Sequence, residues 1–376
     1  MGTEAYVYSG HLSALAADLS IPLAASGQLA SAFALTNALT APFVAAAVSG
    51  YDRRRILVVG LCLIGILNLV ASLLSSFTGL IIIRIMCGLA AGLVGPIATV
   101  AAAQLAGPAN RGKAMAIVVG GLTLAFVLGI PSGSVVGDFA SWRGTFAYAG
   151  IVALAGAVVI GTVLKPMAGG PRPNLSAIRN LAQGSVITNL SMTLVGFAAT
   201  FAVIAFVGPV ITAITALTGS GVGAMQALVG LGSFIGIALG GSYADRPQAS
   251  LAISIAFVTS AIALGAMSLL MEMSMTRAIA IALLSLAMVV GSASLFTRTP
   301  ILQTQLFASV PAPVQPIALA LNQSMVFFGQ GLGALVGGIA IGVGGIEIVG
   351  YAGAAIAVLG LLISINAKPV AAPAHP

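Results

Sequence analysis

The chain contains 376 residues, of which 14 are Lys or Arg and 7 are Asp or Glu. Charged residues therefore make up 6% of the chain, against roughly 25% in an ordinary soluble domain. Hydrophobic residues make up 59%, and the mean hydropathy is +1.15. Such a chain has too few polar groups to cover a soluble surface, which excludes a cytosolic enzyme, a nucleic-acid-binding protein and a disordered chain. The composition predicts an all-α polytopic membrane protein.

Twelve stretches of the chain are apolar over about the 20 residues that a membrane-spanning helix needs. Their long, continuous runs differ from the alternating pattern of membrane β-strands, which excludes a barrel. The first stretch has no basic segment or cleavage pattern around it, which argues against a signal peptide. The predicted spans are 1–17, 27–49, 55–74, 78–105, 113–136, 142–165, 186–216, 221–243, 249–270, 277–296, 314–340 and 345–366.

The positions of the cations predict the orientation of these spans, because Lys and Arg gather in cytoplasmic loops. Eleven of the 14 fall in loops after even-numbered spans or in the C-terminal tail, whereas Arg143 and Arg277 fall on the other side and Arg84 lies within a span. We therefore expect both termini on the cytoplasmic side of a bacterial cytoplasmic (inner) membrane. The net charge of +7 then reflects topology, and no nucleic-acid partner is expected. The eleven cations are Arg53, Arg54, Arg55, Arg111, Lys113, Lys165, Arg172, Arg179, Arg246, Arg298 and Lys368.

A polar stretch rich in Pro and Gly divides the spans into two sets of six. It predicts a cytoplasmic linker at 166–185 between an N-terminal bundle at 1–165 and a C-terminal bundle at 186–366, with a cytoplasmic tail at 367–376. Short motifs recur between the halves: Asp52-Arg53 returns 193 residues later as Asp245-Arg246, and Tyr148-Ala149-Gly150 returns 203 residues later as Tyr351-Ala352-Gly353. Nearly constant offsets favour two similar halves.

Two charged residues, Arg84 and Glu4, are candidates for proton coupling. Arg84 lies within an apolar run, where a cation costs several kcal/mol, so a functional role facing a cavity is favoured over an arginine that snorkels to the interface. Glu4 is a carboxylate in the first span, and a carboxylate that alternates between neutral and charged forms is the simplest proton carrier; the alternative is simple contact with water at the helix end. His11 lies two helical turns further along the same face and is a second titratable candidate.

Small residues in the fourth and fifth spans predict close helix packing. Gly88 and Gly92 follow Arg84 at four-residue spacing, so they lie on its face of the helix. Gly129, Pro131 and Gly133 combine a flat helix face with a kink. We expect packing as their direct role, and that packing is compatible with a gate.

The remaining polar positions allow two interpretations each. Asp52 with Arg53, and Asp245 with Arg246, form short turns that either anchor the protein at the interface or pair between the halves to hold one conformation closed. Uncharged polar residues inside spans either line a substrate cavity or join helices by hydrogen bonds. These residues are Asn37, Asn189, Gln226, Asn322 and Gln323.

The chain shows no motif for a cofactor, a metal or a nucleotide. It lacks a P-loop, its two histidines are too few for a His-based metal cluster, and both cysteines, Cys62 and Cys87, lie inside apolar runs. We therefore expect no enzymatic activity and no cofactor, and we expect transport to be driven by the proton motive force rather than by ATP.

Four motifs carry a resemblance to a known family. They are Gly2-Thr3-Glu4-Ala5-Tyr6 in the first span, Arg84-x-x-x-Gly88-x-x-x-Gly92 in the fourth, Gly129-x-Pro131-x-Gly133 before Trp142-Arg143-x-x-Phe146, and a compressed Gly50-x-Asp52-Arg53 loop. Together they resemble the major facilitator superfamily, specifically its twelve-helix drug:proton antiporter branch, which includes multidrug, chloramphenicol, sugar and nucleoside exporters. The first span departs from the family pattern, because only three residues precede Glu4 where the family has about a dozen.

The resemblance implies a major facilitator fold of two pseudo-symmetric six-helix bundles, with Glu4 as the proton site and Arg84 as its modulator. It implies a monomeric, proton-coupled exporter in the lipid bilayer that moves small amphipathic molecules by alternating access. A dedicated sugar or nucleoside exporter is the alternative within transporters. A membrane sensor or scaffold that transports nothing is the alternative from another class.

Overall fold

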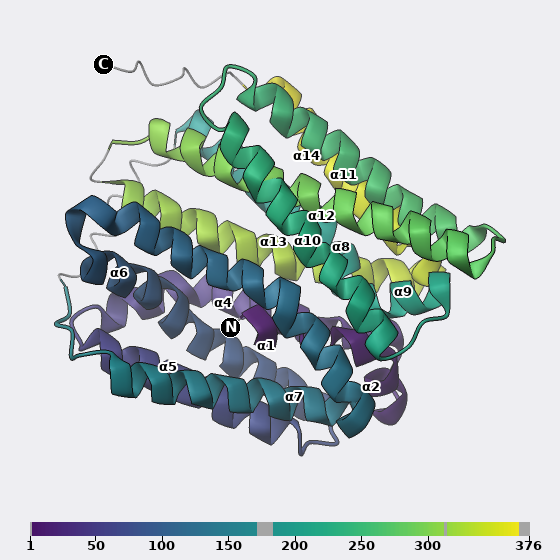
Figure 1. Ribbon diagram of the computed structural model, residues 1–376, viewed down its shortest axis with the longest axis horizontal. Helices are drawn as coiled ribbons and strands as arrows, with labels where there is room; N and C mark the ends of the chain where they lie inside the picture. Colours follow the sequence, from purple (N-terminus) through teal and green to yellow (C-terminus); the bar gives the residue numbers. More distant parts are fainter. Residues whose placement is uncertain (1, 171–182, 312–313, 368–376) are drawn as a thin grey trace.

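The computed structural model describes residues 2–170, 183–311 and 314–367, and no strand occurs among them. The helices of the two halves form two groups, broadly the lower and the upper part of Figure 1. The first group consists of α1 (Gly2–Tyr6), the 3-10 turn η1 (Ser9–His11), α2 (Leu12–Asp18), α3 (Leu23–Ser26), α4 (Gln28–Val48), α5 (Arg53–Ala71), α6 (Phe77–Leu124), the π-helical turn η2 (Ala125–Gly129) and α7 (Ile130–Val163). The second group consists of α8 (Gly184–Ile204), α9 (Val207–Thr215), α10 (Ser220–Tyr243), α11 (Ala249–Glu272), α12 (Arg277–Ala308), α13 (Gln315–Gly344), the 3-10 turn η5 (Ile346–Ile348) and α14 (Val349–Asn366).

Two of the longest helices contain a break in their backbone. In α6 the break is at Gly107, whose φ of +70° suits a residue without a side chain. In α7 the break is at Ala140 and Ser141. Both breaks fall at predicted boundaries between spans, so α6 and α7 together contain the fourth, fifth and sixth predicted spans.

Ten helices in the described part of the chain are long and apolar enough to cross a membrane. Two predicted spans are missing from this set. The first is divided into α1, η1 and α2, and the fifth runs into the sixth within 127–163. The ten helices and these two segments account for the twelve predicted spans.

The first and the seventh span are interrupted at corresponding positions. The chain turns at Val7 and Tyr8 between α1 and η1, and it turns again at Ala205 and Phe206 between α8 and α9. The two turns are 198 residues apart, within the range of offsets of the sequence motifs. Matching interruptions in matching helices are a structural sign of the internal repeat.

Glycines bring the two groups of helices together near the end that carries α2 and α9, on the right of Figure 1. A Cβ on Gly208 would lie 2.2 Å from the carbonyl oxygen of Ser9, and a Cβ on Gly338 would lie 2.7 Å from that of Ala24. Along their length, α4 packs on α13 and α7 packs on α10. Because only glycine leaves room at these points, the halves meet backbone to backbone there.

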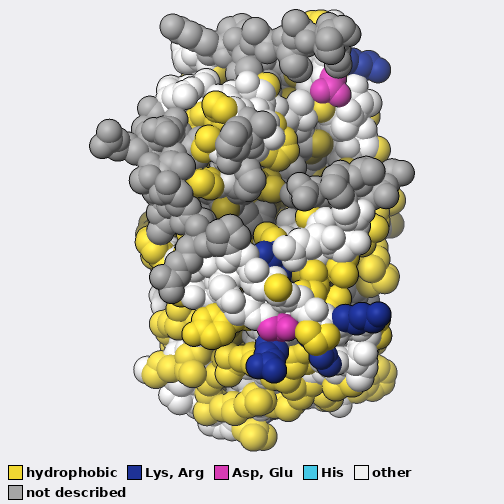
Figure 2. Space-filling model, turned by 90° about the vertical axis from the view of Figure 1, so that its left-hand side faces the viewer, with side chains coloured by type: hydrophobic (Ala, Val, Ile, Leu, Met, Phe, Trp, Pro, Cys, Tyr) yellow, Lys and Arg dark blue, Asp and Glu magenta, His cyan; other side chains and the backbone are white. Residues whose placement is uncertain are grey.

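Cations mark the opposite end of the molecule. Figure 2 looks onto this end and shows Lys and Arg side chains beside Asp and Glu in both halves. Arg55, Lys165 and Arg246 are exposed. The described loops that were predicted to share one side of the membrane therefore lie at one end of the fold.

Arg298 is a correction to the predicted topology. The tenth span was expected to end at residue 296, which placed Arg298 in a loop, but α12 continues to Ala308 and buries Arg298 to 1% exposure. Within the helix, the hydroxyls of Thr297 and Thr299 find partners by donating to carbonyl oxygens one turn earlier, at 2.8 and 3.4 Å. Sequence polarity thus ended the predicted helix too early.

Tight packing between α8 and α13 gives a testable expectation. A Cβ on Gly333 would lie 2.4 Å from the carbonyl oxygen of Ala198, so Gly333→Ala should lower stability by about 1–3 kcal/mol. Gly241→Ala is the matched control, because nothing lies within 4 Å of its Cβ and alanine favours helix. Thermal unfolding of the purified proteins in detergent measures both. An unchanged melting temperature for Gly333→Ala would contradict the close packing.

Candidate functional site

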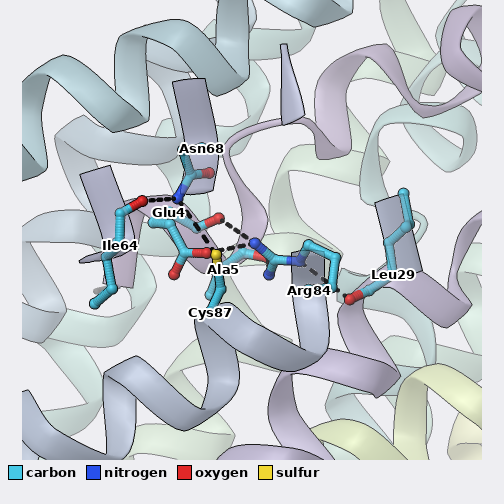
Figure 3. A network of polar contacts seen from close by, with 7 residues as sticks. All are labelled: Glu4, Ala5, Leu29, Ile64, Asn68, Arg84 and Cys87. Atoms are coloured by element: carbon cyan, nitrogen blue, oxygen red, sulfur yellow. Dashed lines mark hydrogen bonds and ion pairs between the residues drawn. The ribbon is translucent and has the colours of Figure 1, made fainter. Parts of the chain in front are cut away.

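The central feature of the first half is a buried ion pair between Glu4 of α1 and Arg84 of α6. The Nη1 atom of Arg84 donates to the Oε1 atom of Glu4, and the two side chains are 1% and 2% exposed respectively. Figure 3 shows the guanidinium pointing at the carboxylate from the facing helix. Arg84 therefore lies in the interior and does not reach an interface, as the snorkelling alternative would require.

The rest of the guanidinium is held by backbone and aromatic rings. Nε donates to the carbonyl oxygen of Leu29 at 3.2 Å, and Nη2 donates to that of Ala5 at 3.2 Å. The guanidinium carbon lies 4.5 Å from the ring centroid of Phe33 and 5.4 Å from that of Tyr8. These contacts disperse the positive charge and fix the position of the group.

The Oε2 atom of Glu4 has no hydrogen-bond partner among the described residues, although the thiol of Cys87 lies beside the carboxylate. On the far side of the pair, the amide nitrogen of Asn68 in α5 donates to the carbonyl oxygen of Ile64 at 2.8 Å and to the sulfur of Cys87 at 3.7 Å. A carboxylate with one paired and one unpaired oxygen has a place to accept a proton. Its protonation would remove the negative charge that Arg84 faces.

The predicted packing residues hold these helices in place. A Cβ on Gly88 would lie 2.6 Å from the carbonyl oxygen of Phe33, and one on Gly92 would lie 3.1 Å from the Cα of Ala41, so α6 lies directly on α4. In the next helix along, a Cβ on Gly129 would lie 2.0 Å from the hydroxyl oxygen of Thr3.

The same close approach continues along α1. A Cβ on Gly133 would lie 2.5 Å from the carbonyl oxygen of Val7, and Pro131 occupies the first turn of α7. The glycines around α1 therefore position Glu4.

His11 lies apart from this ion pair. Its Nε2 atom is 2.8 Å from the carbonyl oxygen of Ser134 and 4.0 Å from Oδ1 of Asp138. The expectation that His11 shares a helix face with Glu4 assumed an unbroken helix, and the turn at Val7 and Tyr8 interrupts that register. His11 instead belongs to the contact between the halves, because Asp138 accepts a hydrogen bond from the backbone nitrogen of Ser220 at 2.6 Å.

The five uncharged polar candidates lie on four helices, α4, α8, α10 and α13. Asn37 is buried with its amide nitrogen unpartnered, and Gln323 is half-buried. Asn189 donates to the carbonyl oxygen of Leu302 at 2.9 Å, and Asn322 accepts from Thr193 at 2.9 Å. These two bonds join helices within the second half.

Gln226 connects the two halves. Its Oε1 atom accepts from the hydroxyl of Ser134 at 2.6 Å, and its Nε2 atom donates to the hydroxyl of Ser9 at 3.2 Å. A similar bond between the halves involves two residues outside the predicted site, because the hydroxyl of Tyr6 donates to Gln330 of α13 at 3.1 Å. Nothing in a single sequence marks such a pair, since its members are 324 residues apart.

The two Asp-Arg turns have local roles. Asp52 caps α5 by accepting from the backbone nitrogen of Arg55 at 3.0 Å, and the backbone nitrogen of Arg53 donates to the carbonyl oxygen of Met167 at 3.0 Å. Asp245 and Arg246 are exposed. Among the described side chains, neither aspartate takes part in an ion pair.

A further ion pair closes the end of α2. The side chains of Arg143 and Trp142 donate to Asp18 at 2.5 and 3.2 Å. These bonds lower the pKa of the Asp18 carboxyl below its ordinary value of 3.8. The stabilisation of the folded state by these bonds to Asp18 is therefore present at neutral pH, and it is lost as the pH falls through that lowered pKa.

Two related bundles of apolar helices, with a buried ion pair inside one of them, are the architecture of a secondary membrane transporter. The chain matches the family model of the Major Facilitator Superfamily over residues 1–313, and it belongs to this family. It is a polytopic membrane protein of the transporter class, and the fold predicted from the sequence is confirmed.

Relatives of known name extend over most of the chain. It is 27% identical to the uncharacterised transporter YbcL of Bacillus subtilis, covering 98% of this chain and 94% of that protein. It is 30% identical to the chloramphenicol resistance protein of Streptomyces lividans, covering 83% and 79%. Its fold is similar to that of a bacterial homologue of the human lysosomal transporter Spinster in an inward-facing and occupied conformation, with a TM-score of 0.75, 16% identity and coverage of 98% and 95%.

The buried pair predicts unequal effects for its two members. Glu4→Gln leaves a permanently charged guanidinium in the interior and should cost about 3–5 kcal/mol. Arg84→Met should cost less, because the remaining carboxyl neutralises itself by taking up a proton. The double variant should be more stable than the Glu4→Gln protein. Thermal unfolding in detergent tests this order, and strictly additive losses would contradict the ion pair.

Proposed function

We propose that the protein is a proton-coupled exporter of small amphipathic molecules, with Glu4 as its proton carrier. The observation that supports this most is the buried Glu4–Arg84 pair, in which Glu4 retains one unpartnered oxygen. Protonation of Glu4 weakens its bond to Arg84, and loss of the proton restores the bond. Such a group has two states that differ in their contacts, as coupling requires.

Helix α1 is suited to pass this change to the second half of the protein. Tyr6 follows Glu4 by two residues, donates its hydroxyl to Gln330 of α13 and packs its ring on Phe201 of α8 with centroids 5.2 Å apart. A shift of α1 that accompanies proton binding therefore acts on both halves at once. This contact supports alternating access, in which the halves rock about a central site.

The proposed setting is the bacterial cytoplasmic membrane, with both termini in the cytoplasm and the monomer as the working unit. The cations of the described loops gather at the end opposite α2 and α9, as cytoplasmic loops do. In this orientation the glycine contacts between the halves lie on the external side. The small amphipathic substrate is in keeping with the named activity of the chloramphenicol resistance protein and with the sparse charge of the interior.

A dedicated exporter of sugars or nucleosides is the second candidate. The buried amides of Asn37 and Asn189 favour it, because each has one atom without a hydrogen-bond partner among the described residues and hydroxylated substrates need such partners. A growth-inhibition panel of antibiotics against pentoses and nucleosides separates the two candidates. A protein that inserts but moves no compound in either group would favour the sensor or scaffold.

Proton coupling predicts a specific defect for Glu4→Gln. The variant should lose efflux driven by a pH gradient, because its amide cannot carry a proton, yet it should still exchange substrate across the membrane at equal pH. Transport into inverted membrane vesicles, with and without a gradient, measures both properties. Gradient-driven efflux at the wild-type rate would rule out Glu4 as the proton carrier.

Arg84 predicts a defect in transport that leaves insertion intact. Arg84→Ala removes the guanidinium that pairs with ionised Glu4, so protonation of Glu4 no longer breaks an ion pair. Gradient-driven efflux should then fall at least tenfold, while the amount of protein in the membrane stays the same. Arg277→Ala is the control, because Arg277 is exposed at the start of α12. Full activity of Arg84→Ala would assign Arg84 to packing alone.

A further inference from the structure

Arg298 is a second buried cation, and it differs from Arg84 in having no counter-charge. Its side chain is 1% exposed, and none of its three guanidinium nitrogens has a hydrogen-bond partner among the described residues. The guanidinium carbon lies 4.1 Å from the ring centroid of Phe257 in α11. On another side it meets the backbone of α8, where a Cβ on Gly196 would lie 3.3 Å from it.

The guanidinium lies inside the helix bundle, away from the ends of α8 and α12. Gly196 follows the start of α8 by twelve residues, and Arg298 precedes the end of α12 by ten. At 1.5 Å per residue, these distances correspond to about 15–18 Å of helix. Because only 1% of the side chain is exposed, a lipid headgroup does not reach it in this structure, so a phosphate of the bilayer is not the missing partner.

No carboxylate of the chain supplies the missing charge. Glu4 is bound to Arg84, Asp18 is bound to Arg143, and Asp138 contacts His11 and Ser220. The other four are half-buried or exposed, and none of the seven lies within 4.0 Å of an Arg298 nitrogen. These four are Asp52, Asp245, Glu272 and Glu347.

The contact between α8 and α12, where Gly196 meets Arg298, is called the seam below. An apolar cavity of about 30 Å³ lies along this seam. Thr200, which lines it, is one turn after Gly196, and Ser292, which also lines it, is six residues before Arg298. Its other walls are almost entirely aliphatic or Met side chains from α8 to α12. Arg298 does not itself line the cavity, whose nearest lining residue on α8, Thr200, is one helical turn from the glycine that meets the guanidinium.

We propose that Arg298 and this cavity bind an amphipathic organic monoanion, with its carboxylate on the guanidinium and its apolar body along the seam. A carboxylate accepts two parallel N–H bonds from one guanidinium, which satisfies nitrogens that are unpartnered here. The single positive charge of the site repels a cation. It neutralises only one negative charge, so a polyanion fits poorly as well. The cavity holds about one water molecule at its present size, so α8 and α12 separate when the ligand enters.

This inference rests on the proposed function, since it names the substrate class of the proposed exporter, but binding is tested without a pH gradient. The protein is placed in nanodiscs of phosphatidylcholine, which carry no net lipid charge. Binding is measured for benzoate, 1-naphthoate and 9-anthroate, each against its neutral amide. Arg298→Gln and Arg298→Lys are compared with Arg277→Gln, the exposed arginine at the start of the same helix.

At least one carboxylate is expected to bind wild type tenfold more tightly than its amide. Arg298→Gln should abolish that preference and leave amide binding unchanged, Arg298→Lys should retain part of it, and Arg277→Gln should behave as wild type. No preference for any carboxylate in wild type, or an undiminished preference in Arg298→Gln, would overturn the proposal.

A second measurement on wild type covers the case in which Arg298→Gln does not fold. The arginine reagent phenylglyoxal is applied with and without the preferred carboxylate, and modification of Arg298 is read by peptide mass spectrometry. Protection by the carboxylate but not by its amide supports the proposal, and equal modification overturns it. Binding is measured at equal pH and without efflux, so a failure of proton coupling is distinguishable from a failure of anion binding.

Discussion

The bond between Glu4 and Arg84 constrains the whole first half of the protein. A guanidinium is too costly to leave uncompensated at this depth, so the helices around it must bring a carboxylate, carbonyl oxygens and aromatic rings to it. That requirement sets how closely α1, α4 and α6 approach one another. The glycines at 88, 92, 129 and 133 are the means of that approach, because each lies where a side chain would strike a neighbouring helix.

The two buried arginines solve the same physical problem differently. Arg84 has a full set of partners within the chain, whereas Arg298 has one aromatic ring and the backbone of α8. The first arrangement leaves no guanidinium nitrogen unpartnered among the described residues, whereas the second leaves all three unpartnered. The proposed proton site and the proposed anion site lie in separate bundles, and α1 contacts both halves.

Sequence reasoning succeeded where a residue's own chemistry determines its place. Scarce charge and long apolar runs predicted the spans, and Glu4 and Arg84 stood out because topology did not need them. It failed where tertiary contacts decide. The hydroxyls of Thr297 and Thr299 donate to carbonyl oxygens within α12, so these polar residues do not end the helix. The sequence pattern predicted a loop there and placed Arg298 in it. The turn after Tyr6 separates His11 from Glu4, and the local sequence pattern did not predict that turn.

The interruptions at 7–8 and 205–206 divide two helices into unequal mechanical parts. A helix bends most easily where its backbone bonds are already missing. The segments beyond the interruptions, η1 with α2 and the short α9, meet each other at Ser9 and Gly208. The η1–α2 segment is ten residues long against five for α1, which bears Glu4, whereas α9 is nine residues long against 21 for α8, which bears Asn189. The two interruptions therefore place a bending point between this contact and the elements that bear the ion pair and the buried amides.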